Sequence, residues 1–536
     1  MIGDSSSRNP VESFAEASLP DLGAMPRYKP VHRDPLLLPV VLAEQIQPGT
    51  FEFALDHLVD HELDLSALDA KFRNDETGAS AYDPRVMLKI VLLAYSRGLN
   101  TSRRIEAACR QNVVFMALSG DSQPSYTHIA KFVRELADQI QPLFTQVLLV
   151  CDRQGLIGRQ MFAFDGVKLP CNASKERSGT HAELRHRAER LDKAASKMIE
   201  LHRSRDGADD ADEGAGGAAR QRRIDDLHRE AQAMREFLAR EQPRRNAKGQ
   251  ELKSNVTDND SAKMATSKGV IQGYAAQAAV DASHQVIVAA DVIGSGSEQS
   301  MLLPMIGQAQ ALAGERTVMT ADAGFHSHEN MRALHEAGIP ALVADGQMRK
   351  RDERFANQQR HRDKPEPLHD KTKVQDKPIR LFRPSDFIVD VQGNCCICPA
   401  GQSLYSSGSR CRINGRIAHR YKGTQGACGL CAMRSQCLRH PEHTPVRQVA
   451  LFASGPQSGH AATELMKRAI DSARGRAIYS QRIATVEPVF GNIRHTKRLD
   501  RFTLRGKEKV GTQWRLYCLV HNIEKLARSG SEESRR

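Results

Sequence analysis

Aromatic residues and long apolar runs are scarce in this sequence, and it opens with a polar segment. Phe, Trp and Tyr together make up 5% of 536 residues, with one Trp among them. No apolar run approaches the roughly 18 residues needed to span a bilayer. The first residues, MIGDSSSRNP, lack the apolar centre of a secretory signal. These absences argue against a membrane partner and against export.

Positive charge, in contrast, is abundant. The formal net charge is +13 and the sequence pI is near 9.3. Such a balance indicates a polyanionic partner, most simply nucleic acid, although a basic surface without such a partner stays open. We therefore expect a cytoplasmic, nucleoid-associated protein. Its length predicts about two to four structural units.

The first part of the chain has few signs of order until about residue 30. Residues 1–30 are rich in Ser, Asp, Glu and Pro and predict a disordered tail. Residues 31–150 show helical spacing, with helices expected through DPRVMLKIVLLAYSRGL, RRIEAACRQNVVFMAL and HIAKFVREL. Short helices that expose Arg103 and Arg104 suit a helix-turn-helix-like DNA-binding domain. A plain helical interaction domain remains the alternative.

Residues 155–346 predict an α/β core. The apolar run MFAFD ends in Asp165, and TVMTAD predicts a strand that ends at Asp322. GYAAQAAVD and HQVIVAADV predict a hairpin that turns at Ala282-Ser283, a helix follows from about Gln299 to Ala313, and IPALVAD predicts a further strand. A buried strand that carries an aspartate at its carboxyl end places a rigid metal ligand, although an aspartate there is also common in turns.

An insertion at 181–250 interrupts this core. Two apolar stripes at helical spacing predict an antiparallel helical hairpin, and the segment DGADDADEGAGGAA between them predicts a flexible tip. Partner binding and simple tolerance of an insertion both remain open for it. The stripes are Ala188, Leu191, Ala195 and Met198, and Ile224, Leu227, Ala231, Met234 and Leu238.

A second insertion, residues 347–470, contains most of the cysteines. Its start, to about Lys377, predicts a linker, and seven of the eleven cysteines fall between Cys395 and Cys437 within a module at 390–440. The pairs Cys396/Cys398 and Cys428/Cys431 suit a tetrahedral Zn²⁺ site that would fix a module too small for its own core. Cys437 could replace a member of either pair, and reduced cysteines that only pack remain the alternative.

Order is expected to return at Ser472, and 471–528 predict the last part of the core. Glu487, Phe490 and Arg494 fall on one helical face, although Pro488 implies that the helix begins or kinks there. A last helix is expected at about 511–527 and a disordered tail at 529–536. The basic stretch from Arg482 to Arg515, which includes the glutamate, predicts DNA-phosphate contacts; the residues concerned are Arg482, Arg494, Lys497, Arg498 and Arg505.

Two strand-borne aspartates and one helix-borne glutamate on a basic chain are what two-metal phosphoryl transfer requires. Hard carboxylate oxygens bind Mg²⁺ or Mn²⁺. Two such ions about 4 Å apart activate the attacking oxygen and stabilise the leaving oxygen of a phosphodiester.

Short sequence words in a fixed order then resemble a known family, the DDE transposases of bacterial insertion sequences, of the IS-eleven-eighty-two type. The resemblance covers roughly residues 30–528. The words are FAFDG at 162–166, TDNDSAKM at 257–264, KGVIQGYAAQAAVD at 268–281, TADAGFHS at 320–327 and VEPVFGNIRH at 486–495, with YDPRVMLKIVL at 82–92 and SRRIEAACRQN at 102–112 in the helical N-terminal domain.

The resemblance implies an RNase H-like catalytic core with Asp165, Asp322 and Glu487 as its triad. It implies an enzyme that binds the terminal inverted repeats of its element, cleaves DNA with two Mg²⁺ or Mn²⁺ ions and joins the end to target DNA, as an oligomer. Two departures are visible: four residues rather than three separate Arg482 from Glu487, and Arg494 replaces the family's lysine. In TDNDSAKM, Asp258 and Asp260 are expected to belong to a DNA-facing or structural loop.

Two other functions remain open at this point. The first is a DNA-binding regulator derived from such an element and without catalysis. The second is a nuclease that cuts DNA without joining it.

Overall fold

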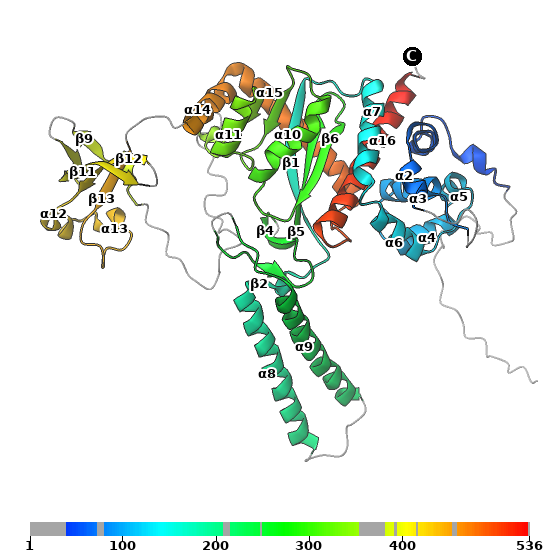
Figure 1. The fold of residues 1–536 in the computed structure, drawn as a ribbon, viewed down its shortest axis with the longest axis horizontal. Coiled ribbons are helices and arrows are strands. Elements are labelled where there is room, and N and C mark those ends of the chain that lie inside the picture. The colour runs from blue at the N-terminus through cyan, green and yellow to red at the C-terminus, as the bar shows by residue number, and fades with distance from the viewer. Residues whose placement is uncertain are drawn as a thin grey trace, which may run out of the picture. The chain divides into compact units, whose positions relative to one another are not determined.

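The computed structural model of the protein describes residues 39–71, 80–206, 215–246, 249–267, 269–352, 381–390, 394–413, 416–452 and 458–533. Within these ranges the fold is mixed α/β with a helical N-terminal region, as expected (Figure 1). No helix there combines the length and the apolar character that crossing a membrane requires. The predicted tail at 1–30 lies outside the described residues.

A six-stranded sheet forms the centre of the α/β part. Its order is β4-β5-β1-β7-β8, with β6 also paired to β5. The strand β5 runs antiparallel to β1, β4 and β6, whereas β1, β7 and β8 are mutually parallel. The bounds are β1 (Met161–Pro170), β4 (Ala262–Thr266), β5 (Gly269–Asp281), β6 (Ile287–Ile293), β7 (Val318–Ala321) and β8 (Ala341–Val343).

The strand β5 shows why this sheet is stable. Every residue from Gln272 to Asp281 is buried, and small Ala side chains leave room for the helices packed beside it. The hairpin from β5 to β6 confirms the expected turn. The long helix α16 (Lys507–Glu533) contacts β6 and buries Trp514, whose indole N–H donates to the carbonyl of Gln277 at 2.9 Å.

Helices of the N-terminal region share one hydrophobic core with the sheet. The tyrosine rings of Tyr95 and Tyr517 stack with centroids 4.7 Å apart and join α3 to α16. The helix expected over RRIEAACRQNVVFMAL is divided at Asn112, whose side chain caps the second piece. The helices are α1 (Phe51–His57), α2 (Ser66–Asp69), α3 (Pro84–Ser96), α4 (Ser102–Gln111), α5 (Val113–Ser119), α6 (Tyr126–Glu135) and α7 (Ile140–Arg153), preceded or joined by η1 (Leu42–Gln45) and η2 (Leu58–Glu62).

The inserted helical hairpin consists of α8 (His181–Asp206) and α9 (Ala215–Arg240), which lie side by side (Figure 1). Two small apolar clusters join them, around Ala188 with Met234 and around Ala195 with Ile224. Residues 215–219, expected in the flexible tip, instead belong to α9, because their alanines favour helix despite the two glycines. The short strands β2 (Ser178–Gly179) and β3 (Ser254–Asn255) pair at the base of the hairpin.

The cysteine-rich module contains a separate five-stranded antiparallel sheet in the order β13-β12-β11-β10-β9. Only a few side chains form its core, in a cluster of five buried residues. The elements are β9 (Ile388–Asp390), β10 (Cys395–Ile397), β11 (Ser403–Ile413), β12 (Arg416–Lys422) and β13 (Gln448–Phe452), with η8 (Pro384–Asp386), α12 (Gln425–Gly429) and α13 (Arg434–Cys437).

Several expected boundaries differ from the structure. Order returns before Ser472, because α14 (Ser458–Asp471) precedes α15 (Ala473–Gly491). The helix α16 continues through residues 529–533, which were expected in the tail. The start of the expected linker forms η6 (Met348–Arg351), and residues 353–380 of it lie outside the described residues.

The helix expected at Gln299–Ala313 is divided into η4 (Gln299–Met301), α10 (Leu302–Ala309) and η5 (Gln310–Leu312). The remaining elements are η3 (Lys175–Arg177), α11 (His328–Glu336) and η9 (Asn492–Thr496).

Candidate active site

Asp165 and Asp322 lie on neighbouring parallel strands at the same level. Phe164 of β1 pairs with Ala321 of β7, so the two aspartates are the next residue on each strand. Asp322 follows the end of β7 as predicted. Asp165 does not end its strand, since β1 continues to Pro170 by pairing with β5; it stands where the pairing with β7 ends. The carboxylates therefore emerge side by side where the two strands diverge.

A buried arginine from α15 holds Asp165. Arg482 donates to the Asp165 carboxylate at 2.8 Å, and only 7% of Arg482 is exposed. Burial raises the pKa of Asp165, and the charge of Arg482 acts against that rise. The backbone N–H of Gly166 also donates to the carboxylate, at 2.8 Å. Arg482 thus favours the ionised form of Asp165, which is the form that binds a cation.

A third carboxylate, Glu298, faces the same place from the loop after β6. One of its oxygens lies 2.7 Å from the point where a Cβ on Gly166 would stand. The other lies 3.0 Å from the equivalent point on Gly324, and an Asp322 oxygen also lies 3.0 Å from that point. Because both oxygens lie 3.0 Å from the same point, the distance between this Glu298 oxygen and the Asp322 oxygen is at most twice 3.0 Å. Burial and then the Asp322 charge raise the pKa of Glu298.

Sequence reasoning missed Glu298. It lies in the polar segment GSGSEQS just before η4, where an acidic residue is ordinary helix-capping chemistry. Its distance from Asp165 in the sequence gives no sign that β5 and β6 bring the two together. The glycines at 166 and 324 were the only indication in this part of the sequence, because a residue without a Cβ lets another side chain come close to its backbone.

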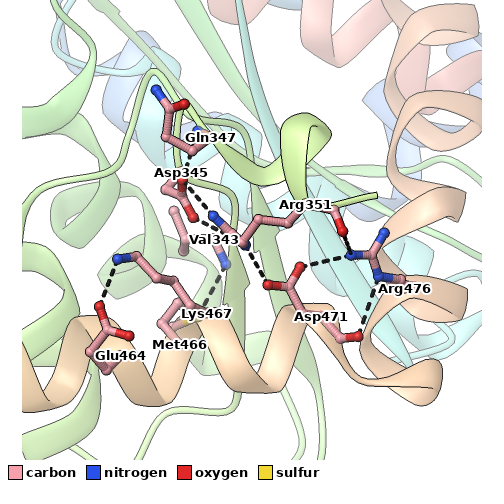
Figure 2. A network of polar contacts seen from close by, with 9 residues as sticks. All are labelled: Val343, Asp345, Gln347, Arg351, Glu464, Met466, Lys467, Asp471 and Arg476. Carbon is pink, nitrogen blue, oxygen red and sulfur yellow. Dashed lines mark hydrogen bonds and ion pairs between the residues drawn. The ribbon is translucent and has the colours of Figure 1, made fainter. Parts of the chain in front are cut away.

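Beside Asp322 lies a cavity of about 470 Å³ between the end of the sheet and α15. A network of arginines and aspartates forms its far wall. Figure 2 shows Arg351 between Asp345 and Asp471, with nitrogen–oxygen distances of 2.7 Å and 2.5 Å. Arg476 pairs with Asp471 at 3.0 Å and also with Asp352. These pairs fix η6 against the junction of α14 and α15.

The network uses its own carboxylates for structure. Burial raises the pKa of Asp345, but the hydrogen bonds from Arg351 and the backbone N–H of Gln347, together with the charges of Arg351 and Lys467, outweigh that effect, so the pKa lies below its usual range. Asp345 is thus committed to an arginine, whereas Asp322 accepts from the backbone N–H of Gly324 at 2.8 Å.

Glu487 lies inside α15, which passes through Pro488 without beginning there. The residue is exposed. Arg476, Ser480 and Ile483 line the cavity, and Glu487 continues their helical stripe by four residues. Within the described residues, no three His, Cys, Asp or Glu side chains stand close enough together to hold a metal ion as they are placed. Glu487 thus shares the cavity face but is not gathered with the aspartates.

The predicted phosphate-binding residues fall into two groups. Lys497 is fully buried and pairs with Glu524 at 2.7 Å, so it does not lie on a surface that DNA can meet. Arg482 likewise faces Asp165 and the interior. The others keep partial or full exposure; they are Arg103, Arg104, Arg494, Arg498 and Arg505.

Arg505 borders a basic hollow of about 510 Å³ together with Lys175, Arg177 and Arg501. Its Nε donates to the carbonyl of Asn172 at 2.7 Å, which orients the guanidinium beside the end of β1. This hollow was not predicted.

Both aspartates of the loop TDNDSAKM make structural contacts, although Asp260 is exposed. Asp258 is buried and accepts from the Tyr274 hydroxyl at 2.7 Å. Asp260 accepts from the backbone N–H of Lys507 at 2.9 Å, at the first residue of α16. These carboxylates hold the fold around the sheet.

The predicted zinc ligands do not all lie together. Cys396 is fully buried in the core of the small sheet. Cys398, Cys428 and Cys431 line one cavity, and the cysteine that joins them there is Cys437. All described cysteines are free thiols.

Comparison with known families adds two matches. Residues 397–527 match the family described as Transposase DDE domain, and residues 40–135 match Transposase domain (DUF772). No curated protein matches the chain. The matches confirm the expected resemblance to DDE transposases and leave the insertion-sequence type untested. Glu487 lies inside the first match, whereas Asp165 and Asp322 lie outside both.

Proposed function

We propose that this protein is the DNA transposase of a bacterial insertion sequence of the IS-eleven-eighty-two type. It binds the terminal inverted repeats of its element, cleaves the strands and joins them to target DNA. The observation that carries this proposal is the pair Asp165 and Asp322 on adjacent parallel strands, within a chain that contains a transposase DDE domain. Within the six-stranded sheet, the antiparallel strands β1, β5 and β6 are followed in the chain by β7 and β8, which run parallel to β1, and this order supports an RNase H-like core.

The residues around the aspartates fit a divalent cation. Asp165 and Asp322 supply hard oxygen donors at the point where β1 and β7 stop pairing. Because Gly166 and Gly324 have no side chain, the Glu298 carboxylate can approach this place. When bound there, Mg²⁺ or Mn²⁺ supplies activation of the attacking oxygen and stabilisation of the leaving oxygen, which is the chemistry of two ions about 4 Å apart.

Glu487 is the proposed third member of the catalytic set. Its support is its place on the cavity face of α15, four residues beyond Ile483, and its place within the DDE match. The role of Arg482 is to keep Asp165 ionised against the effect of burial. The aspartates are held by strands and the glutamate by a helix, so in this proposal α15 has to bring the third carboxylate to the aspartates.

DNA contact is proposed at the exposed basic residues. Arg505 and its neighbours around the hollow by Asn172 have the guanidinium and ammonium groups that phosphates attract. Arg494 is half-buried and its Nε is buried, so a contact with phosphate would use the other guanidinium nitrogens. Arg103 and Arg104 on α4 would act with the N-terminal helices, and two copies would pair the element ends.

The deciding experiment separates an enzyme from a regulator. The DNA flanking the reading frame is sequenced for imperfect inverted repeats, and purified protein is incubated with that DNA with Mg²⁺ or with chelator. A transposase gives Mg²⁺-dependent nicks at the repeat ends and joined products. Tight binding with no nick under either condition would establish the regulator instead. Nicks without joined products would establish a nuclease.

A further inference from the structure

The cysteine-rich module has too small a core to account for its fold. Its five-stranded sheet buries one cluster of five side chains, in which Phe387, Leu404 and Tyr421 are the large members. Several apolar residues of its strands are exposed instead, among them Ile388 at 68%. Small sheets with so little buried apolar area generally need a cross-link, a metal or a partner.

Four thiols surround a single small cavity in this module. Cys398, Cys428, Cys431 and Cys437 line a space of about 30 Å³, which is roughly the volume of one water molecule. Burial raises the pKa of the Cys437 thiol, Arg447 acts against that rise, and Cys398, Cys428 and Cys431 add to it. All three therefore lie within electrostatic reach of Cys437, although they come from separate turns of the chain.

The backbone around these thiols is arranged to hold them there. The N–H of Gln402 donates to the Cys398 sulfur at 3.3 Å, which holds the sulfur in place. The Cys428 sulfur lies 2.5 Å from where a Cβ on Gly423 would stand, so only glycine leaves it this place.

Two arginines fix the backbone on either side. Arg434 donates to the carbonyl of Cys428 at 2.8 Å, and Arg447 donates to that of Cys437 at 3.1 Å. Both guanidinium groups border the cavity, so their positive charges would offset the negative charge of four thiolates.

We propose that Cys398, Cys428, Cys431 and Cys437 bind one Zn²⁺ ion, and that Cys396 does not. Cys396 is fully buried in the apolar cluster, and Cys437 takes the fourth place. The four sulfurs give the tetrahedral thiolate set of a structural zinc site. Among the described residues, no three potential ligands lie close enough together to hold a metal ion. Zinc binding therefore requires the four thiol side chains to rotate into the cavity, and each thiol loses its proton on binding.

The test uses the full chain, purified without chelator, with zinc measured by elemental analysis. We expect about one zinc per chain, and Co²⁺ in its place should give the visible absorption of a tetrahedral thiolate site. Cys437→Ser should lose the metal. Cys396→Val and Cys411→Ser, the latter in the same module but outside the cavity, should keep it.

Two results would overturn the proposal. One is a wild-type protein that binds neither zinc nor Co²⁺. The other is loss of metal from Cys396→Val with full retention in Cys437→Ser. Should Cys437→Ser fail to fold, Cys431→His offers a second variant: it preserves a zinc ligand, so it should retain metal with a shifted Co²⁺ spectrum, and an unchanged spectrum would count against the site.

A separate observation concerns Glu298, and it rests on the proposed function. Its two oxygens face the glycine positions 166 and 324, the second beside Asp322. The Gln277 side chain lies beside the same position on Gly166 as the Glu298 carboxylate. We infer that Glu298 is a further ligand of the divalent cation held by Asp165 and Asp322.

Binding of Mn²⁺ alone tests this inference, followed by electron paramagnetic resonance and without DNA. Glu298→Gln should weaken Mn²⁺ binding about tenfold or more, whereas Glu329→Gln, an exposed glutamate in the first turn of α11, should not change it. Normal Mn²⁺ binding by Glu298→Gln with loss in Asp322→Asn would refute the role of Glu298 and leave the proposed function intact. Normal binding and cleavage by both variants would instead contradict the proposed function.

Discussion

The two sheets of this protein solve the problem of holding polar ligands in different ways. In the six-stranded sheet a large apolar core fixes the strands, and the aspartates need only follow them. In the five-stranded sheet the buried cluster has five side chains, and in the zinc site proposed above the thiols complete the fold. The first site therefore costs stability, because burial acts against its charges, whereas the second contributes stability once metal is bound.

Removing zinc should separate the two regions most strongly. A strong chelator should expose residues 381–452 to proteolysis, since structural zinc contributes on the order of 10 kcal/mol to small domains. The only tryptophan, Trp514, is buried in the large core, so its fluorescence should stay unchanged. Limited proteolysis and fluorescence on one sample provide the measurement. Simultaneous loss of both signals would show that the regions unfold together.

Trp514→Ala is the opposite perturbation. It removes a fully buried side chain that stacks near Phe490, with ring centroids 6.3 Å apart, and donates to the carbonyl of Gln277. The expected cost is about 3–5 kcal/mol in the free energy of unfolding, measured by urea denaturation with circular dichroism. The zinc content should be the same as in wild type, and a parallel loss of zinc would argue against independent regions.

Arg482→Ala should change the pH dependence of cleavage. Burial raises the pKa of Asp165 and Arg482 opposes it, so without the guanidinium the pKa rises further. Asp165 then becomes protonated at higher pH, and the acid limb of the activity profile should move toward neutral pH. Arg482→Lys keeps the charge and should move it less. If the acid limb of Arg482→Ala lies at the same pH as in wild type, the ion pair between Arg482 and Asp165 has no role in catalysis.

The smallest effect is expected at the surface. Arg505→Ala should lower the slope of log affinity for DNA against log salt by about one, with thermal stability unchanged. Lys497→Ala should leave the salt slope unchanged and lower the thermal stability. It removes the positive charge that faces Glu524, which costs about 3–5 kcal/mol for a buried pair. Salt titrations and thermal melts of both variants check this contrast. If Arg505→Ala has the same salt slope as wild type, the basic hollow does not contact DNA.

Much of the large sheet was predictable because its strands are long, apolar and separated by clear turns. The hairpin of β5 and β6 and the aspartate after β7 follow from such patterns. The continuation of β1 beyond Asp165 was not predictable, because GVKLP reads as a loop until β5 is there to pair with it.

The same limit explains the missed ligands. Glu298 reaches the aspartates only through contacts distant in sequence, whereas Cys437 was named from the sequence as a possible replacement in either cysteine pair. Close spacing favoured Cys396 over Cys437 as the partner of Cys398. Cys396 alternates into the sheet interior, a fact that depends on the register of β10 with β11. The buried Lys497 also shows that a basic run does not tell which of its members face solvent.

The most direct test of the account is strand cleavage by Asp165→Asn, Asp322→Asn and Glu487→Gln on DNA carrying the element's end. Each variant should bind this DNA as wild type does in a gel shift, yet lose Mg²⁺-dependent cleavage by about a thousandfold or more. Cleavage at the wild-type rate by any one of the three, with DNA binding intact, would contradict the proposed catalytic set.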